Sequence, residues 1–271
     1  KKSSRLLKLI ARGLILEEFM YTISDLSKEY VVNKNKIVAF KNISFDIRQK
    51  EFFCIMGPSG SGKSSLLKTL FGIEKPDSGY IVFDGIKYED GIPSSEFKKI
   101  GYVYQNDNLL PWRSVEGNLK LPLEVFGLKG EEWLSRVTEM LKLVGLYEYK
   151  DALPRELSGG MKQRVGIARA LVYNPEVVLM DQPFSALDAI TRNIIVNEFI
   201  LIWKKTKKTF VMVTNDLHEA ILCGSRVLVF SKEAAVKPKI IEIDIPFEDR
   251  NADIIFDKRY KELRSELQQF V

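Results

Sequence analysis

Residues 57–64 read Gly-Pro-Ser-Gly-Ser-Gly-Lys-Ser and match the phosphate-loop pattern G-x-x-x-x-G-K-[ST] at every position. The loop follows an apolar run, Phe52–Met56, and leads into a segment of helical character, Lys63–Phe71. Glycines let backbone N–H groups close around phosphate oxygens, and the start of the helix adds its dipole. In such a loop Lys63 reaches the outer phosphates of a nucleotide, and Ser64 ligates Mg²⁺. The residues predicted to contact the nucleotide here are Gly57, Pro58, Ser59, Gly60, Ser61, Gly62, Lys63, Ser64 and Ser65.

A magnesium ion at this loop needs a further protein oxygen, and Asp181 can supply it. Asp181 ends the apolar run Val177–Asp181, and open α/β sheets place their ligands at the carboxyl ends of their strands. We therefore predict Ser64 and Asp181 as metal ligands. The loop and this aspartate together are typical of P-loop NTPases, a class that includes kinases, GTPases and motor proteins.

Residues 157–164 read Leu-Ser-Gly-Gly-Met-Lys-Gln-Arg and begin another predicted helix, shortly before the metal-binding aspartate. Ser-Gly-Gly at a helix start is a second anion-binding arrangement, and one nucleotide does not need two of them from one chain. The segment resembles the LSGGQ signature of the ABC ATPase family, with Met161 in place of the glutamine. In that family two ATP-binding subunits enclose two ATP molecules head to tail. The resemblance implies that Ser158, Gly159 and Gly160 contact ATP held by the opposing subunit.

The resemblance extends over about residues 20–250, and three further positions match the family in order. Tyr30 corresponds to an aromatic residue that stacks on adenine. Gln105 follows the predicted strand at 100–104 and corresponds to a glutamine that contacts Mg²⁺ and the attacking water and senses the membrane subunit. Asp188 ends the sequence Ser-Ala-Leu-Asp, which matches the loop that carries information across the dimer.

Four shorter segments look like the ATP-binding subunits of nitrate, sulfonate, taurine and bicarbonate importers, namely residues 108–112, 180–184, 187–192 and 245–250. The resemblance implies an ATP-hydrolysing subunit that energises import of a small solute such as one of these anions, with ATP and Mg²⁺ as cofactors. The implied partners are a second ATP-binding subunit, transmembrane permease subunits and a solute-binding protein. The implied location is the cytoplasmic face of the cell membrane.

Two further positions depart from the family, and both are catalytic. The family keeps a glutamate after the metal aspartate as the base that polarises water, whereas this chain has Gln182. An amide cannot accept that proton, and loss of a positioned base costs about 10²–10⁴-fold in rate. The family also keeps a histidine on the γ-phosphate where this chain has Asn215. The only histidine, His218, is expected on a solvated first helical turn and does not replace it.

These departures leave alternatives open. We favour a Gln182 introduced to hold ATP unhydrolysed, because glutamine is isosteric with glutamate, beside a naturally atypical Asn215. A catalytically silent regulatory subunit of a heterodimeric transporter is the second interpretation. A soluble ABC ATPase acting on DNA or ribosomes would be favoured by a long coiled-coil insertion or a tandem second ATPase, and these 271 residues contain neither.

The order of apolar runs predicts an α/β fold of the P-loop NTPase type. Alternating apolar and polar residues at 21–26 and 43–47 indicate an N-terminal antiparallel β-subdomain, and strands that then alternate with helices indicate a mainly parallel sheet. Helical spacing at 114–146 predicts an inserted helical subdomain at about 106–160. The predicted domains are an N-terminal extension at 1–19, an ABC ATPase domain at 20–250 and a C-terminal helix at 251–271.

The helical insertion is also the predicted contact with the membrane subunits. Leu109, Leu110 and Trp112 are expected to be exposed beside Gln105. We therefore predict that a membrane protein docks near residues 106–145.

Charge and cysteine content exclude several other functions. Residues 1–19 contain five basic and two acidic residues, a net +3 of the chain's +5, so the remainder lacks the broad basic patch of a nucleic-acid-binding protein. This segment predicts a basic amphipathic helix on anionic lipid or on a partner, or else a packed tail ahead of a natural start at Met20. Cys54 and Cys223 belong to no metal-binding cluster and are expected to be inert thiols of a cytoplasmic protein. No apolar stretch approaches the roughly 18–20 residues that span a bilayer.

Overall fold

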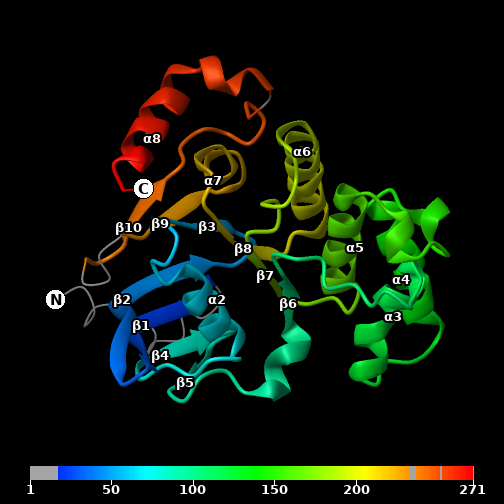
Figure 1. Cartoon of the computed structure of the whole chain (residues 1–271), viewed down its shortest axis with the longest axis horizontal. Helices are drawn as coiled ribbons and strands as arrows, with labels where there is room; N and C mark the ends of the chain where they lie inside the picture. Colours follow the sequence, from blue (N-terminus) through cyan, green and yellow to red (C-terminus); the bar gives the residue numbers. More distant parts are fainter. Residues whose placement is uncertain (1–17, 232–235, 251, 271) are drawn as a thin grey trace.

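The computed structural model describes residues 18–231, 236–250 and 252–270, and it contains two sheets with helices packed around them (Figure 1). The smaller sheet is antiparallel with the strand order β2-β1-β4-β5, and the larger has the order β10-β9-β3-β8-β7-β6. The strands are β1 (Phe19–Val32), β2 (Asn35–Arg48), β3 (Phe52–Met56), β4 (Ser78–Phe83), β5 (Ile86–Tyr88), β6 (Ile100–Val103), β7 (Val177–Asp181), β8 (Thr209–Thr214), β9 (Arg226–Val229) and β10 (Lys239–Glu242).

The larger sheet is parallel from β9 to β6, and β10 pairs antiparallel to β9 at its edge. Its central strands are buried on both faces, which explains their continuous apolar runs. Successive side chains point to opposite faces of a strand. In β3, Phe52, Cys54 and Met56 therefore join one core, and Phe53 and Ile55 join the other.

Helices cover both faces of the larger sheet. On one face α2 packs between this sheet and the smaller one, and on the other face lie α5, α6 and α7. The helices α3 and α4 stand at one side of the molecule against α5 (Figure 1). The helices are α2 (Lys63–Phe71), α3 (Val115–Val125), α4 (Glu131–Leu143), α5 (Gly159–Leu171), α6 (Ala189–Thr206), α7 (Leu217–Cys223) and α8 (Lys258–Gln268), with the 3-10 turns η1 (Ser94–Lys99), η2 (Tyr147–Tyr149), η3 (Pro154–Glu156) and η4 (Ala252–Phe256).

The predicted α/β architecture is confirmed, including the bounds of β3, α2 and β7. Two short strands, β5 and β10, are additional to the predicted ones. The helical stretch at 114–146 is divided into α3 and α4, whose junction contains Gly127 and Gly130. The predicted amphipathic segment at 1–19 lies almost wholly outside the described residues, and the domain limits stay a prediction.

Two sequence-based expectations about exposure are wrong. Leu109 is not exposed but buried, because it joins the apolar core on one face of the larger sheet, to which Val115 and Leu119 of α3 also belong. His218 is not solvated: it is half-buried, and its Nδ1 lies 2.8 Å from the Tyr260 hydroxyl of α8. Burial lowers the pKa of His218.

The two cysteines are free and fully buried, as inert thiols would be. Burial also raises the pKa of Cys54, which keeps this thiol protonated. Across the described parts of the chain, we find no helix with the length and apolar character needed to span a membrane.

Candidate nucleotide-binding site

The phosphate loop leaves the end of β3 and turns directly into α2. Gly57 has φ +149°, and a Cβ there would lie 2.6 Å from the carbonyl oxygen of Phe230. Gly62, which precedes the helix, has φ +93°, and a Cβ there would lie 2.2 Å from the carbonyl oxygen of Ala39. Both positions therefore require glycine, on steric as well as conformational grounds. At Gly60 a Cβ would meet no atom within 4 Å, so the outer side of the loop is open to a ligand.

The Lys63 side chain lies within the loop, where it is 4% exposed as a residue. Its Nζ donates hydrogen bonds to the carbonyl oxygens of Gly57 at 2.8 Å and Pro58 at 2.6 Å. Burial lowers the pKa of Lys63 to about 8, while the nearby Asp181 acts in the opposite direction. An anion that entered the loop would face an ammonium group already ordered by two backbone acceptors.

Ser64 and Asp181 meet from different elements. The Ser64 hydroxyl in α2 donates to Oδ1 of Asp181, at the end of β7, over 2.9 Å. Burial raises the pKa of Asp181, and the hydrogen bond from Ser64 opposes that rise. A hydroxyl beside a carboxylate suits Mg²⁺, which prefers oxygen ligands and keeps several from water or phosphate. Among the described residues no group of three or more His, Cys, Asp or Glu could hold a metal ion.

Gln182 and Asn215 form an amide pair at the ends of neighbouring strands. Asn215 Nδ2 donates to Gln182 Oε1 over 3.0 Å. The backbone of Gln182 has φ +46°, and its N–H donates to the carbonyl oxygen of Val213 at 2.9 Å. The pair carries no charge at neutral pH, because an amide neither gains nor loses a proton in that range.

A pocket of about 250 Å³ opens over the loop and reaches the smaller sheet. Tyr30, at its rim, is half-buried, and its hydroxyl donates to Glu74. Lys28 Nζ lies 5.5 Å from the centre of the Tyr30 ring. The lining residues are Tyr30, Ile37, Val38, Ala39, Ser59, Gly60, Gly62, Lys63, Ser64, Ser65 and Gln182.

Other predicted site residues are outside this pocket. Ser158 is exposed and caps α5, accepting a hydrogen bond from the N–H of Met161 at 3.3 Å. Gly160 faces α6, where a Cβ would lie 3.1 Å from Thr191 Cγ2. Asp188 caps α6 by accepting from the N–H of Thr191 at 3.0 Å. Gln105 is exposed just beyond β6 and does not line the pocket.

Two charged residues near the amide pair were missed by the sequence analysis as site residues, Arg192 and Glu219. Arg192 lies in the first turn of α6, and Glu219 is buried in the first turn of α7. Their one indication in the sequence was that both lie in segments that resemble the family, Arg192 in residues 187–192 and Glu219 shortly after Asn215. Nothing in the local sequence indicates that they contact each other.

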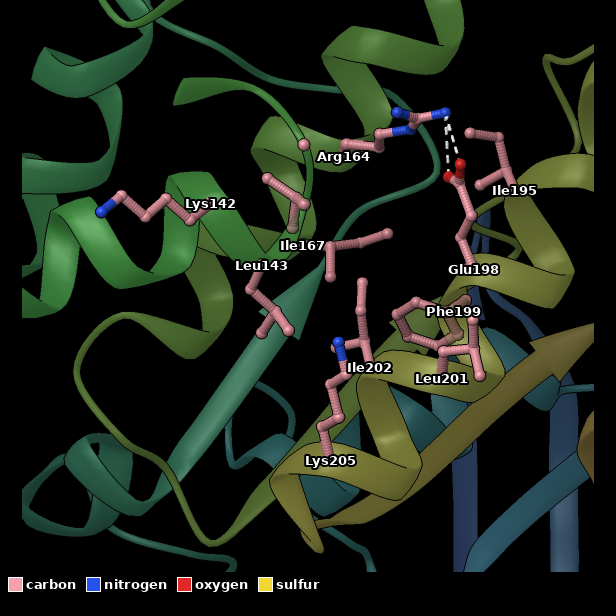
Figure 2. A pocket seen from close by; sticks show the side chains of 12 residues that line it. Lys142, Leu143, Arg164, Ile167, Ile195, Glu198, Phe199, Leu201, Ile202 and Lys205 are labelled. Carbon is pink, nitrogen blue, oxygen red and sulfur yellow. Dashed lines mark hydrogen bonds and ion pairs between the residues drawn. The ribbon is translucent and has the colours of Figure 1, made fainter. Parts of the chain in front are cut away.

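A second hollow, of about 200 Å³, lies between α4, α5 and α6 (Figure 2). Its lining includes apolar residues of α6, such as Phe199 and Ile202, and an ion pair between Arg164 and Glu198 at 2.8 Å. It contains none of the phosphate-loop residues.

A phosphate loop between β3 and α2, with an aspartate ending a strand of the same parallel sheet, defines a P-loop nucleotide-binding protein. Comparison with known families narrows this class. The family described as ABC transporter matches residues 40–185, and the chain belongs to that family. The predicted family and fold are thereby confirmed.

The chain is 41% identical over 235 residues to the taurine import ATP-binding protein of Rhizobium johnstonii, covering 84% of this chain and 87% of that protein. It is 39% identical over 224 residues to the nitrate import ATP-binding protein of Synechocystis sp., covering 83% and 82%. It is similar to the solved structure of a dimeric ATP-binding cassette in a post-hydrolysis state bound to ADP and phosphate. The TM-score is 0.72 and the identity 34%, over 84% of this chain and 100% of that one.

Proposed function

We propose that this chain is the ATP-binding subunit that energises an ABC importer for a small anion such as nitrate, taurine, another sulfonate or bicarbonate. The observation that carries the proposal is the contact between Ser64 and Asp181 beside a buried Lys63. Import is supported by the taurine and nitrate import proteins among the relatives. In this proposal the other subunits of the transporter select which of these anions is imported.

The phosphate loop would hold the nucleotide, with Lys63 on its outer phosphates and Tyr30 beside its base. Ser64 and Asp181, with Gln105 approaching from β6, would hold Mg²⁺. When bound, the metal would stabilise negative charge on the phosphate oxygens. The residues of this chain would bind and orient the nucleotide, and the backbone N–H groups of the loop would offset its charge.

Slow turnover is part of the proposal. Gln182 stands at the position of the water-polarising base, and its Oε1 already accepts a hydrogen bond from Asn215. A carboxylate at 182 could accept the same hydrogen bond, so the geometry would tolerate the change. In this proposal the chain retains the contacts for binding, and position 182 holds an amide that cannot receive the proton.

We expect Gln182→Glu to raise ATP hydrolysis in the assembled complex by at least about ten-fold, since a positioned base contributes about 10²–10⁴-fold. Steady-state phosphate release from the complex measures this. The double variant Gln182→Glu with Lys63→Ala is the control, because it restores the carboxylate but removes the phosphate contact, and it should remain inactive. Equal hydrolysis by the parent and Gln182→Glu would contradict the assignment of position 182 as the base position.

The proposed partners are a second ATP-binding subunit, permease subunits and a solute-binding protein, with this chain on the cytoplasmic face of the membrane. Ser158, Gly160 and Asp188 belong to elements away from the pocket of their own chain. A second subunit could place its nucleotide against them. The dimeric cassette among the similar structures supports such an arrangement.

A catalytically silent regulatory subunit is the second candidate function, and the Gln182–Asn215 pair favours it. In that case this chain would bind ATP and complete the hydrolytic site of a different partner. Consider a complex in which only the partner subunit has a glutamate at the position that corresponds to 182. Each hydrolytic site of the partner would then release phosphate at its full rate. Under the first candidate, the same complex would gain turnover when Gln182→Glu is introduced here.

A further inference from the structure

Arg192 bridges two segments that lie far apart in the sequence. Its Nη2 donates to the carbonyl oxygen of Leu187 at 2.9 Å, and its Nη1 donates to Oδ2 of Asp216 at 3.3 Å. Leu187 belongs to the loop before α6, and Asp216 directly follows Asn215 of the amide pair. One guanidinium group thus fixes the distance between these two segments, as a planar fork of donors can do.

Glu219 adds a second carboxylate near the guanidinium group, at ion-pair distance. Its Oε1 lies 3.7 Å from Nε of Arg192, and this Nε is buried without a hydrogen-bond partner in the described part of the chain. The other oxygen of Glu219 accepts a hydrogen bond from the Thr214 hydroxyl, which in turn accepts from the N–H of Asp216 at 3.0 Å. The carboxylate is therefore tied to the end of β8, one residue before Asn215.

The same loop reaches the amide pair by a second connection. The Ser185 hydroxyl donates to the carbonyl oxygen of Gln182 at 3.0 Å. A shift of residues 185–188 would consequently act on Gln182 through Ser185 and on Asn215 through Arg192 and Asp216. Arg192 itself does not line the nucleotide pocket.

We propose that Arg192 is a positioning residue that couples the seating of a second copy of this chain on residues 185–188 to the Gln182–Asn215 pair. This inference rests on the proposed function. Nucleotide binding by the isolated subunit needs only the phosphate loop and so does not depend on Arg192. ATP-driven association of two subunits does depend on it, because the 185–188 and 214–216 segments must hold one relative position.

The test uses the full chain with Arg192→Ala and Arg192→Lys, and it compares MgATP affinity with ATP-dependent dimerisation by light scattering. We expect Arg192→Ala to bind MgATP within about two-fold of the parent and to dimerise at least about ten-fold more weakly. Arg192→Lys should fall between them, because a single ammonium group keeps the charge but lacks the planar fork that reaches both Leu187 and Asp216. Glu198→Gln is the matched control, since Glu198 lies on the same helix as Arg192 and pairs with Arg164 of α5, away from both segments (Figure 2).

Each outcome has a defined meaning. Unchanged dimerisation in both Arg192 variants would overturn the inference and leave the proposed function standing. Equal weakening by Glu198→Gln would also overturn it, since a general disturbance of α6 would then explain the loss. A parent chain that bound MgATP but did not associate would contradict the proposed function as well. Arg192→Lys keeps the test decisive if Arg192→Ala does not fold.

The pH dependence of dimerisation distinguishes a positioning role of Arg192, which involves the charge of Glu219, from a role in packing alone. Burial raises the pKa of Glu219 to about 7. The titratable and charged groups that act on it or that it acts on are Arg192 from α6, Asp216 before α7, Cys54 from β3 and Cys223 at the end of α7.

Above its pKa the Glu219 carboxylate is charged and attracts Arg192, and below it the attraction is lost. Dimerisation of the parent should therefore weaken from about pH 8 to about pH 6. Glu219→Gln keeps an acceptor for Thr214 but removes the titration, so its profile should be flatter than that of the parent. An unaltered slope in Glu219→Gln would exclude the carboxylate from the coupling.

Discussion

The ammonium group of Lys63 is buried, and burial disfavours its charged form. Two backbone carbonyl oxygens hold its ammonium group inside the loop, and burial lowers its pKa to about 8. In a nucleotide complex, phosphate oxygens with full negative charges would face Lys63 in place of these two neutral carbonyl oxygens. In the proposed complex the pKa of Lys63 would rise again.

We expect MgATP binding to take up protons at about pH 8.5, because part of Lys63 is neutral in the free chain and charged in the complex. Calorimetric titration in two buffers of different ionisation enthalpy measures the uptake. Lys63→Arg serves as the control, since arginine stays protonated in this range and should abolish the uptake. A binding enthalpy independent of the buffer in the parent would contradict the prediction.

At the scale of elements, α7 is the helix that supports the amide pair, and it is held at both ends. Its cap, Asp216, accepts from the N–H groups of His218 at 2.7 Å and Glu219 at 3.1 Å. At the other end the buried Arg250 guanidinium donates to the carbonyl oxygens of Ile221 at 2.9 Å and Gly224 at 2.7 Å. These carbonyls would otherwise lack partners at the helix end.

Arg250→Ala should lower the free energy of unfolding by about 3 kcal/mol or more, because buried carbonyl groups left without partners cost about 1–3 kcal/mol each. Urea unfolding measures the change. Arg259→Ala is the control, since it removes an exposed ion pair to Asp244 at 2.6 Å, and exposed pairs contribute little to stability. Similar losses in both variants would show that Arg250 does not anchor α7.

At the scale of the whole molecule, the pocket over the phosphate loop and the start of α5 are proposed to contact different nucleotides. The pocket lies over the phosphate loop, whereas Ser158 is exposed on α5 and lines no part of it. A second anion-binding helix start is useful only if another subunit brings the anion. Association should therefore follow ATP in preference to ADP, because the γ-phosphate adds charge to the contact.

In a mixed complex with a hydrolysing partner, Ser158→Arg in this chain should abolish the partner's hydrolysis while this chain still binds ATP. The bulky side chain would occupy the space proposed for the partner's γ-phosphate. Ser158→Asn is the control, because asparagine also caps helices and should retain part of the partner's activity. If the partner's hydrolysis survived Ser158→Arg, the head-to-tail arrangement would be wrong for this protein.

The proposed contact with the permease subunits also concerns the whole molecule, because it joins this chain to other subunits. Trp112 is 73% exposed beyond β6, in the segment that follows Gln105. Trp112→Glu should release the permease subunits in a co-purification assay and leave MgATP affinity unchanged. Phe256→Glu is the control at a similarly exposed aromatic residue, 72% exposed, on η4. Retention of the permease by Trp112→Glu would place the contact elsewhere.

The local sequence determined the phosphate-loop motif and the strands beside it. The phosphate loop is continuous in the chain, and the apolar runs of β3 and β7 stand between turn residues, so their limits follow from pattern alone. Gly57 and Gly62 could be recognised in the motif for the same reason. The short edge strands β5 and β10 were not predicted, since a few residues at a sheet edge carry little periodic signal.

Only the tertiary structure decided which distant side chains meet. His218 contacts Tyr260, 42 residues away, and Asn215 contacts Gln182, 33 residues away. Leu109 is buried in an apolar cluster that includes residues of α3 and α5, although its neighbours in the chain are exposed or half-buried. The contacts of Arg192 depend likewise on how α6 and α7 pack. A periodic pattern in the sequence indicates which face of a helix or strand is apolar. Which side chains contact that face depends on how the elements pack together.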